Sequence, residues 1–240
     1  MTTSKKKYLR WLIPILIVIF VFSAFLIYTG DYYHAKPEAL DALKSDTDVT
    51  ITKTDYGYLF DGPSKTDALV FYPGAKVEEE AYAKLLHLLA KEGMDVCLVS
   101  MPFNLAVLGP NKADDVMKLY NYENWYIGGH SLGGAMAADY ASDNADKLKG
   151  VILLAAYPTK QLDKSLLEIS IYGSKDGVLN LDKVKEGKQY APDQFFEYVI
   201  EGSNHAQFGN YEAQEGDHNA TITSDMQQQL TVDYIIENIE

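Results

Sequence analysis

Short apolar runs alternate with amphipathic helical segments through most of this chain, and that alternation limits the possible folds more than any other feature of the sequence. Apolar runs typical of buried strands occupy residues 68–72, 95–100, 125–128, 151–155, 168–172 and 195–200. Segments with apolar residues at helical spacing lie at residues 79–91, 112–120, 132–142, 182–190 and 225–239. Helices that repeatedly separate buried strands indicate a mostly parallel sheet covered by helices on both faces. The sequence therefore predicts an α/β fold.

We expect the α/β domain to cover residues 49–240. It begins with a predicted hairpin of strands at residues 49–53 and 56–61. Residues 30–48 are polar and acidic and are predicted to form a spacer. Ligands of open α/β sheets bind beyond the carboxyl ends of the strands, so the loops that follow strands are where we expect a site.

Residues 11–29 form a run of nineteen residues without a charge. A helix of this length spans about 28 Å, close to the hydrocarbon thickness of a bilayer. A cleaved signal peptide is the alternative, but its apolar region is usually about 7 to 15 residues long and ends at small residues. Here Ser23 and Ala24 are followed by the bulky Phe25. We therefore predict a transmembrane anchor at residues 11–29, with the lipid bilayer as its partner.

The charges on either side of this segment differ in sign. Residues 1–10 hold Lys5, Lys6, Lys7 and Arg10 and no acid, whereas the rest of the chain has 17 basic and 34 acidic residues. Basic residues beside a membrane span stay in the cytoplasm, so we expect a single-pass cell-membrane protein with an extracytoplasmic domain. The acidic domain is not expected to bind nucleic acid through a general basic surface.

The segment Gly128-Gly129-His130-Ser131-Leu132-Gly133-Gly134 lies between a predicted strand and a predicted helix. It fits a nucleophile elbow, a sharp turn that presents a serine at the N-terminus of a helix. Gly129 and Gly133 occupy the two places where a side chain would collide with the neighbouring strand and helix. A glycine-rich turn without a catalytic role is the alternative. We predict Ser131 as a nucleophile.

A serine hydroxyl needs a general base, and His205 is our candidate. It follows the predicted strand at 195–200, so it lies at the same sheet edge as Ser131. The other four histidines are less suitable. His34 adjoins the membrane segment and His87 lies within a predicted helix. His130 belongs to the elbow and His218 lies deep in a polar loop.

The carboxylate that orients the histidine is predicted to be Asp176. It follows the strand at 168–172 and lies between Ser131 and His205 in the chain. An aspartate in a glycine-flanked turn is ordinarily only a turn former, so the prediction depends on those two partners. Asp182 is the rival, and we assign it to the start of the next helix.

Two backbone N–H groups are expected to form the oxyanion hole. One belongs to Leu132, directly after the nucleophile, and the other to the loop after the strand at 68–72. Within that loop Ala75 is the candidate donor, and Gly74 lets the backbone turn.

Four motifs occur together in the order of a known family. They are Tyr72-Pro73-Gly74-Ala75-Lys76-Val77, Met101-Pro102-Phe103-Asn104-Leu105-Ala106, the elbow, and Asn204-His205-Ala206-Gln207-Phe208-Gly209. With them, residues 49–240 resemble the α/β-hydrolase superfamily, and within it a small, cap-less bacterial branch related to dienelactone hydrolases. The resemblance implies a triad of Ser131, Asp176 and His205. It implies no substrate, because that branch has no common assigned substrate. Dienelactone hydrolases use a cysteine nucleophile where this chain has a serine, so their substrate is not carried over to this chain.

The site is expected to be shallow and open. Only twelve residues, 156–167, separate two predicted strands at the place where larger relatives insert a helical cap. The loop at 206–223 is long enough to cover part of the site. We predict that the substrate-binding walls are Met101, Phe103, Tyr157, Phe208 and Tyr211. The alternative is that these residues form a tyrosine-rich surface without a binding role.

These features predict a serine hydrolase that cleaves small-molecule carboxylic esters through an acyl-enzyme. A thioesterase, transacylase or peptidase would use the same triad, and a non-catalytic anchored binding module is a further alternative. We expect no cofactor and no metal, because no His-x-x-His motif occurs and Cys97 lies in a predicted buried strand. The sequence does not indicate an oligomeric state.

Overall fold

The protein is described by a computed structural model that covers residues 3–239, with side chains described from residue 11 onward. The chain divides into two units, Met1–Tyr32 and Tyr33–Glu240. The basic side chains between residues 1 and 10, on which the predicted topology depends, lie outside the described residues.

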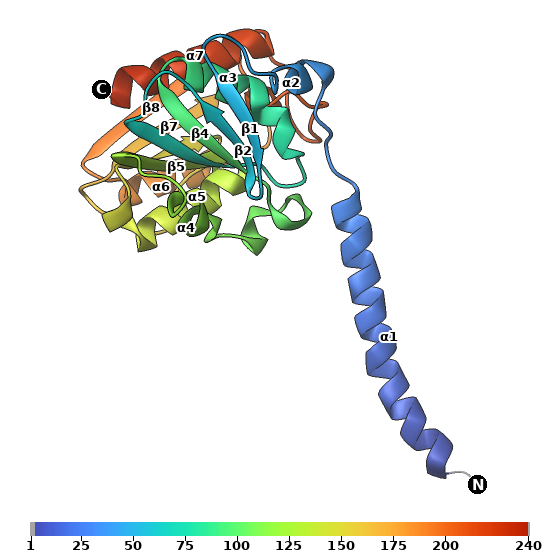
Figure 1. Cartoon of the computed structure of the whole chain (residues 1–240). Coiled ribbons are helices and arrows are strands. Elements are labelled where there is room, and N and C mark those ends of the chain that lie inside the picture. Colours follow the sequence, from blue (N-terminus) through green and yellow to red (C-terminus); the bar gives the residue numbers. More distant parts are fainter. Residues whose placement is uncertain (1–2, 240) are drawn as a thin grey trace. The chain divides into compact units, whose positions relative to one another are not determined.

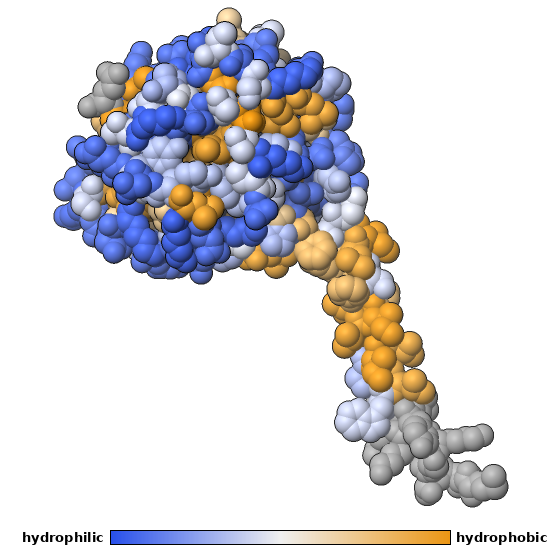
Figure 2. Space-filling model, viewed as in Figure 1, coloured by the Kyte–Doolittle hydropathy of each residue, from blue (hydrophilic) through white to orange (hydrophobic). Residues whose placement is uncertain are grey.

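The first unit contains one long helix, α1 (Thr3–Gly30). Its portion Trp11–Gly30 is long and apolar enough to cross a bilayer. Most of its large apolar side chains are exposed, whereas a core helix of a globular protein would bury them. Figure 2 shows hydrophobic residues over most of the surface of this portion. Membrane anchors and signal sequences share these properties.

The second unit is built on a sheet of eight strands in the order β1-β2-β4-β3-β5-β6-β7-β8 (Figure 1). The strands are β1 (Thr50–Thr54), β2 (Gly57–Asp61), β3 (Asp67–Tyr72), β4 (Met94–Val99), β5 (Asn124–His130), β6 (Gly150–Leu154), β7 (Leu167–Gly173) and β8 (Gln194–Ile200). All neighbours from β4 to β8 pair in parallel, and β2 is antiparallel to both β1 and β4. The carboxyl ends of β3 to β8 therefore meet at one edge, where their loops can build a site.

Helices cover both faces of the sheet (Figure 1). One face carries α2 (Pro37–Asp41), α3 (Ala83–Lys91) and α7 (Ser224–Ile239), and the other carries α4 (Lys112–Met117), α5 (Leu132–Asp143) and α6 (Leu181–Gly187). Successive strand residues point to opposite faces, so Leu69 and Phe71 belong to one core, and Val70 and Tyr72 to the other. Single 3-10 turns complete the fold at Glu79–Tyr82, Pro102–Asn104, Ala106–Leu108, Ala145–Lys147, Lys188–Tyr190 and Ala206–Phe208.

This architecture confirms the predicted α/β fold with a mostly parallel sheet. Residues 155–166, which join β6 to β7, contain neither helix nor strand, so no cap domain is inserted there. The second unit begins at Tyr33, inside the segment 30–48 that we expected to be a spacer. Residues 33–48 thus pack as part of the α/β unit.

Candidate active site

Ser131 lies at the sharp turn between β5 and α5. Its φ of 53° is in the left-handed region, which a residue with a side chain adopts only when its surroundings hold it there. A Cβ atom on Gly129 would lie 2.4 Å from the backbone oxygen of Tyr72, and one on Gly133 would lie 2.2 Å from the same atom. Both glycines are therefore needed for the close approach of the elbow to β3, as the sequence predicted.

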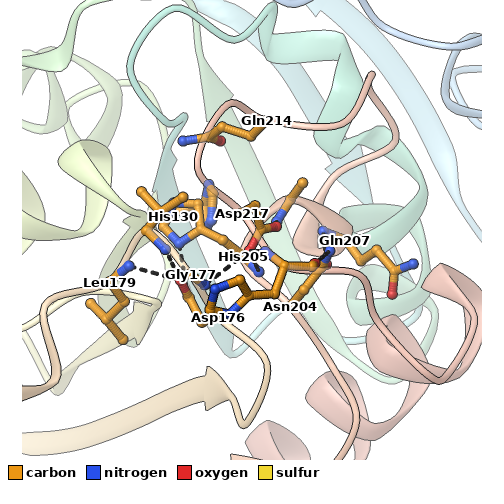
Figure 3. Close-up of polar contacts among 12 residues, drawn as sticks. His130, Asp176, Gly177, Leu179, Asn204, His205, Gln207, Gln214 and Asp217 are labelled. Carbon is orange, nitrogen blue, oxygen red and sulfur yellow. Dashed lines mark hydrogen bonds and ion pairs between the residues drawn. The ribbon is translucent and has the colours of Figure 1, made fainter.

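His205 and Asp176 lie in the loops after the neighbouring strands β8 and β7. His205 Nδ1 is 2.8 Å from Asp176 Oδ2, and both side chains are buried. The other carboxylate oxygen accepts hydrogen bonds from the backbone N–H groups of Val178 at 2.9 Å and Leu179 at 2.7 Å (Figure 3). The carboxylate is thus fixed on both oxygens, and it can hold Nδ1 of the imidazole protonated.

Ser131 and His205 line the same pocket, whose volume is about 250 Å³. Within residues 3–239, Nε2 of His205 is buried and has no hydrogen-bond partner. With Nδ1 donating to Asp176, the Nε2 lone pair is available to take a proton. Catalytic hydrogen bonds are often open in the absence of substrate and tighten when it binds.

Asp217 supports this histidine, although the sequence analysis did not identify it. Its Oδ1 accepts from the backbone N–H of His205 at 3.2 Å and of Gly177 at 3.1 Å, and its Oδ2 accepts from Ala206 at 2.9 Å (Figure 3). One carboxylate therefore ties the His205 loop to the Asp176 loop. No spacing pattern in the sequence indicates this role, because Asp217 lies in a long irregular loop.

A buried pair, Tyr82 and His130, lies behind the elbow. The Tyr82 hydroxyl accepts from the backbone N–H of Gly74 at 3.1 Å and is 2.8 Å from His130 Nδ1. Burial, with the nearby imidazole of His205, lowers the pKa of His130 well below its usual value, so this ring is neutral at pH 7. The centroid of the His130 ring is 4.5 Å from that of His205. A neutral ring here avoids repulsion when His205 takes up a proton.

The two predicted oxyanion donors lie on adjacent loops. Leu132 is the first residue of α5, and Ala75 follows β3, which pairs directly with β5. In the described part of the chain, neither backbone N–H donates to another group. A free N–H at a helix N-terminus favours developing negative charge.

Of the five predicted wall residues, Tyr157 lines the pocket beside Ser131. Met101 and Phe208 are buried, Phe103 is exposed, and Tyr211 lines a separate cavity. The position of a residue in a loop does not fix the direction of its side chain, which explains these four placements. The remaining walls of the pocket are Leu132, Ala135, Ala155, Ala156, Val178, Leu179 and Asn180.

The described residues offer few groups that could bind a metal ion or react as a thiol. No cluster of three or more histidine, cysteine, aspartate or glutamate side chains there is suited to hold a metal ion. Cys97 is buried in β4, and burial raises the pKa of its thiol to about 12. It therefore stays protonated and packs as a small apolar side chain.

Comparisons with known proteins agree on the fold. A family model described as "Alpha/beta hydrolase family" matches residues 68–229. No curated protein sequence matches the chain. Among solved structures, the predicted CIB-like hydrolase of Thermoplasma acidophilum is 16% identical, with a TM-score of 0.57, and the match covers 79% of this chain and 99% of that one.

Two further solved structures are similar over comparable lengths. Est1E from Butyrivibrio proteoclasticus is 15% identical with a TM-score of 0.57, covering 80% of this chain and 99% of that one. Naproxen esterase (carboxylesterase NP) from Bacillus subtilis is 12% identical with a TM-score of 0.58, covering 85% and 95%. At these identities the likeness concerns the fold, and the relation to dienelactone hydrolases stays a prediction.

Proposed function

The chain belongs to the alpha/beta hydrolase family, and we propose that it is a serine hydrolase that cleaves carboxylic esters, with Ser131, His205 and Asp176 as its catalytic residues. One observation carries the proposal: a serine held at a left-handed turn shares a pocket with a histidine whose Nδ1 is bonded to a buried carboxylate. This arrangement supplies a nucleophile, a base and a group that orients the base.

The first half of the reaction forms an acyl-enzyme. His205 Nε2 takes the hydroxyl proton of Ser131 as Oγ attacks the ester carbonyl carbon, and the carbonyl π electrons move onto oxygen. The oxyanion then collapses, the bond to the alkoxy group breaks, and the alcohol leaves with the proton from His205. Asp176 stabilises the imidazolium that exists between these steps.

The second half regenerates the enzyme. Water loses a proton to His205 and attacks the acyl carbon, and the new tetrahedral intermediate expels Ser131, which takes the proton back. In both halves the backbone N–H groups of Leu132 and Ala75 would stabilise the oxyanion. Removal of one such donor from an oxyanion hole typically lowers kcat roughly 10²- to 10³-fold.

The pocket favours small acyl groups. Its volume of about 250 Å³ is smaller than the roughly 300–1,000 Å³ of sites for drug-sized ligands. Its walls are mostly alanine, leucine and valine, and Val178 among them is 37% exposed. A short acyl chain would fit against these apolar walls while the alcohol group extends into solvent.

Labelling with a fluorophosphonate tests the nucleophile, because this probe reacts only with an activated serine. We expect the full-length wild-type protein to label, the Ser131→Ala variant not to label, and Ser142→Ala, which alters a serine at the far end of α5, to label like wild type. Equal labelling of Ser131→Ala and wild type would refute the assignment.

A series of p-nitrophenyl esters of increasing acyl length tests the substrate class. We expect kcat/KM to be highest for acetyl to butyryl esters and to fall for longer chains. Preference for chains of eight or more carbons would contradict the small pocket. Hydrolysis of thioesters or anilides without hydrolysis of esters would leave the triad in place and overturn the ester assignment.

We also propose that residues 11–29 anchor the enzyme in the cell membrane, with the N-terminus in the cytoplasm and the catalytic unit outside. The length and composition of Trp11–Gly30 and the basic residues that precede it support this topology. A membrane-impermeant maleimide tests it, because the chain has one cysteine and Cys97 is buried. A Lys164→Cys variant, altered at an exposed position, should label in intact cells. Labelling only after permeabilisation would contradict the topology.

A further inference from the structure

Residues 33–36, which we call the strap, cross between two loops at the active-site edge of the sheet. The first is the loop that follows β3 and carries Ala75. The second is the loop that follows β8 and carries His205. The strands themselves do not join these loops, because β5, β6 and β7 lie between β3 and β8 in the sheet.

The strap pairs with the loop after β3 through its backbone. The N–H of Tyr33 donates to the carbonyl oxygen of Lys76 at 2.7 Å, and the N–H of Glu78 donates to the carbonyl oxygen of Tyr33 at 2.9 Å. These two bonds form a parallel bridge between Tyr33 and Val77. The N–H of Ala35 donates to a carboxylate oxygen of Glu78 at 2.7 Å. The strap is thus hydrogen-bonded to this loop at residues 76–78, directly after Ala75.

The backbone of that loop needs such support. Lys76 has a φ of 56°, in the left-handed region that a residue with a side chain adopts only when neighbours hold it. On its other side, its N–H donates to the carbonyl oxygen of Asn104 at 2.8 Å. Lys76, the residue directly after Ala75, is therefore held by its carbonyl oxygen to the strap and by its N–H to the loop after β4.

The strap also holds the loop that follows His205. The N–H of Lys36 donates to the carbonyl oxygen of Asn210 at 2.9 Å. The N–H of Glu215 donates to the hydroxyl of Tyr33 at 3.1 Å, and the ring of Tyr33 lies 5.5 Å from that of Tyr211. Side chain and backbone of the strap therefore contact this loop at three places.

We propose that the strap sets the distance between the oxyanion donor Ala75 and the base His205, and that Tyr33 and Lys36 are positioning residues of the esterase. The proposal rests on the proposed function, which gives those two groups their roles. The oxyanion forms at one loop while the proton moves at the other, so both must keep their positions in the same transition state. A displacement of 1 Å can lower a rate about 10²-fold. The segment that enters the catalytic unit from α1 is thus part of its machinery.

A proline at position 36 tests one end of the strap. Lys36 has a φ of −76°, which proline adopts, and Lys36→Pro removes the N–H that donates to Asn210. Lys36→Ala is the matched control, because it also loses the lysine side chain but keeps the N–H. At the other end, Tyr33→Pro removes the donor to Lys76, and Tyr33→Phe keeps it. All are measured as full-length protein in detergent, with active sites counted by fluorophosphonate.

We expect kcat per active site for p-nitrophenyl acetate to be about tenfold lower in Lys36→Pro than in Lys36→Ala, with KM changed less than twofold. We expect kcat per active site to be lower in Tyr33→Pro than in Tyr33→Phe as well. If Tyr33→Pro does not fold, the comparison of Lys36→Pro with Lys36→Ala tests the proposal alone. If wild type is active but Lys36→Pro and Lys36→Ala have equal kcat, whatever their melting temperatures, the positioning role of the strap is refuted. Wild-type protein that neither labels nor hydrolyses esters would instead refute the proposed function, and with it the catalytic role of the strap.

Discussion

Nδ1 of His205 lies 2.8 Å from Oδ2 of Asp176, although 29 residues separate the two in the chain. The contact arises because β7 and β8 are neighbours in the sheet, so the loops that follow them begin side by side. Both side chains are buried, which protects the pair from competition by water. A carboxylate in this position fixes the tautomer of the imidazole and leaves Nε2 to exchange protons with the substrate and Ser131.

Replacing Asp176 by asparagine should therefore lower kcat about 10³- to 10⁴-fold, because an amide at this position no longer holds the imidazole in the productive tautomer. The steady-state kinetics of ester hydrolysis measure this. Asp182→Asn is the control: Asp182 is an exposed carboxylate in the same region, paired with Lys185 at 3.5 Å, and its loss should leave kcat unchanged. The triad assignment fails if the two variants have similar rates.

Asp217→Asn should lower kcat about tenfold and the free energy of unfolding by about 1–3 kcal/mol. The amide nitrogen cannot accept a hydrogen bond, so backbone N–H groups of His205 or Ala206 lose their acceptor. Asp163→Ala removes a comparable acceptor of a backbone N–H, that of Ser165, in an exposed loop away from the site. Chemical denaturation and kinetics of both variants separate the two effects. A normal kcat in Asp217→Asn would show that this carboxylate has no influence on the base.

Tyr82→Phe leaves two buried groups, the N–H of Gly74 and Nδ1 of His130, without their partner. Each buried unsatisfied group costs about 1–3 kcal/mol, so we expect a clear loss of stability. We also expect a lower kcat, because Gly74 precedes the oxyanion donor Ala75. Tyr140→Phe removes a hydroxyl bonded to Asp114, away from the elbow, and should change stability without changing kcat per active site. Equal kinetic behaviour of the two variants would contradict a link from Tyr82 to catalysis.

The inner strands β3, β4 and β6 were predictable because each is a nearly continuous apolar run with a loop or helix on either side. The boundaries that differ have local causes. The strand expected at 125–128 continues to His130, since Gly129 and His130 pair with Leu153 and Leu154 of β6 although glycine disfavours strands. The helix expected at 182–190 is α-helical only to Gly187 and continues as a 3-10 turn.

The Asp176–His205 contact was predictable because both residues follow strands, and parallel strands bring the ends of their loops to one edge. The contacts of Asp217 and the strap were not, because they join irregular segments without any periodicity, and no sequence pattern indicated that the Tyr82 hydroxyl reaches His130 on β5. Phe208 illustrates the same limit. It follows His205 as expected, but its ring packs 5.6 Å from that of His130 in the core and not on the pocket wall.

Glu168 introduces a pH dependence that is separate from catalysis. It lies on β7, it is 1% exposed, and one of its carboxylate oxygens has no hydrogen-bond partner among the described residues. Burial, with a smaller effect of the Glu197 charge, raises the pKa of Glu168 to about 8 from 4.5. The folded protein therefore holds a proton that the unfolded chain releases above pH 4.5.

A carboxyl group with a raised pKa stabilises the fold only while it is protonated, so its contribution is complete below pH 4.5 and is lost as the pH rises toward 8. Between pH 5 and pH 7.5 this amounts to about 3 kcal/mol of unfolding free energy. Glu168→Gln stays neutral throughout. The free energy of unfolding of both proteins is measured with urea at pH 5 and pH 7.5. From the lower to the higher pH, the stability of the variant relative to wild type should rise by about 3 kcal/mol. A wild-type-to-variant difference that is the same at both values would mean that Glu168 titrates normally in the folded protein.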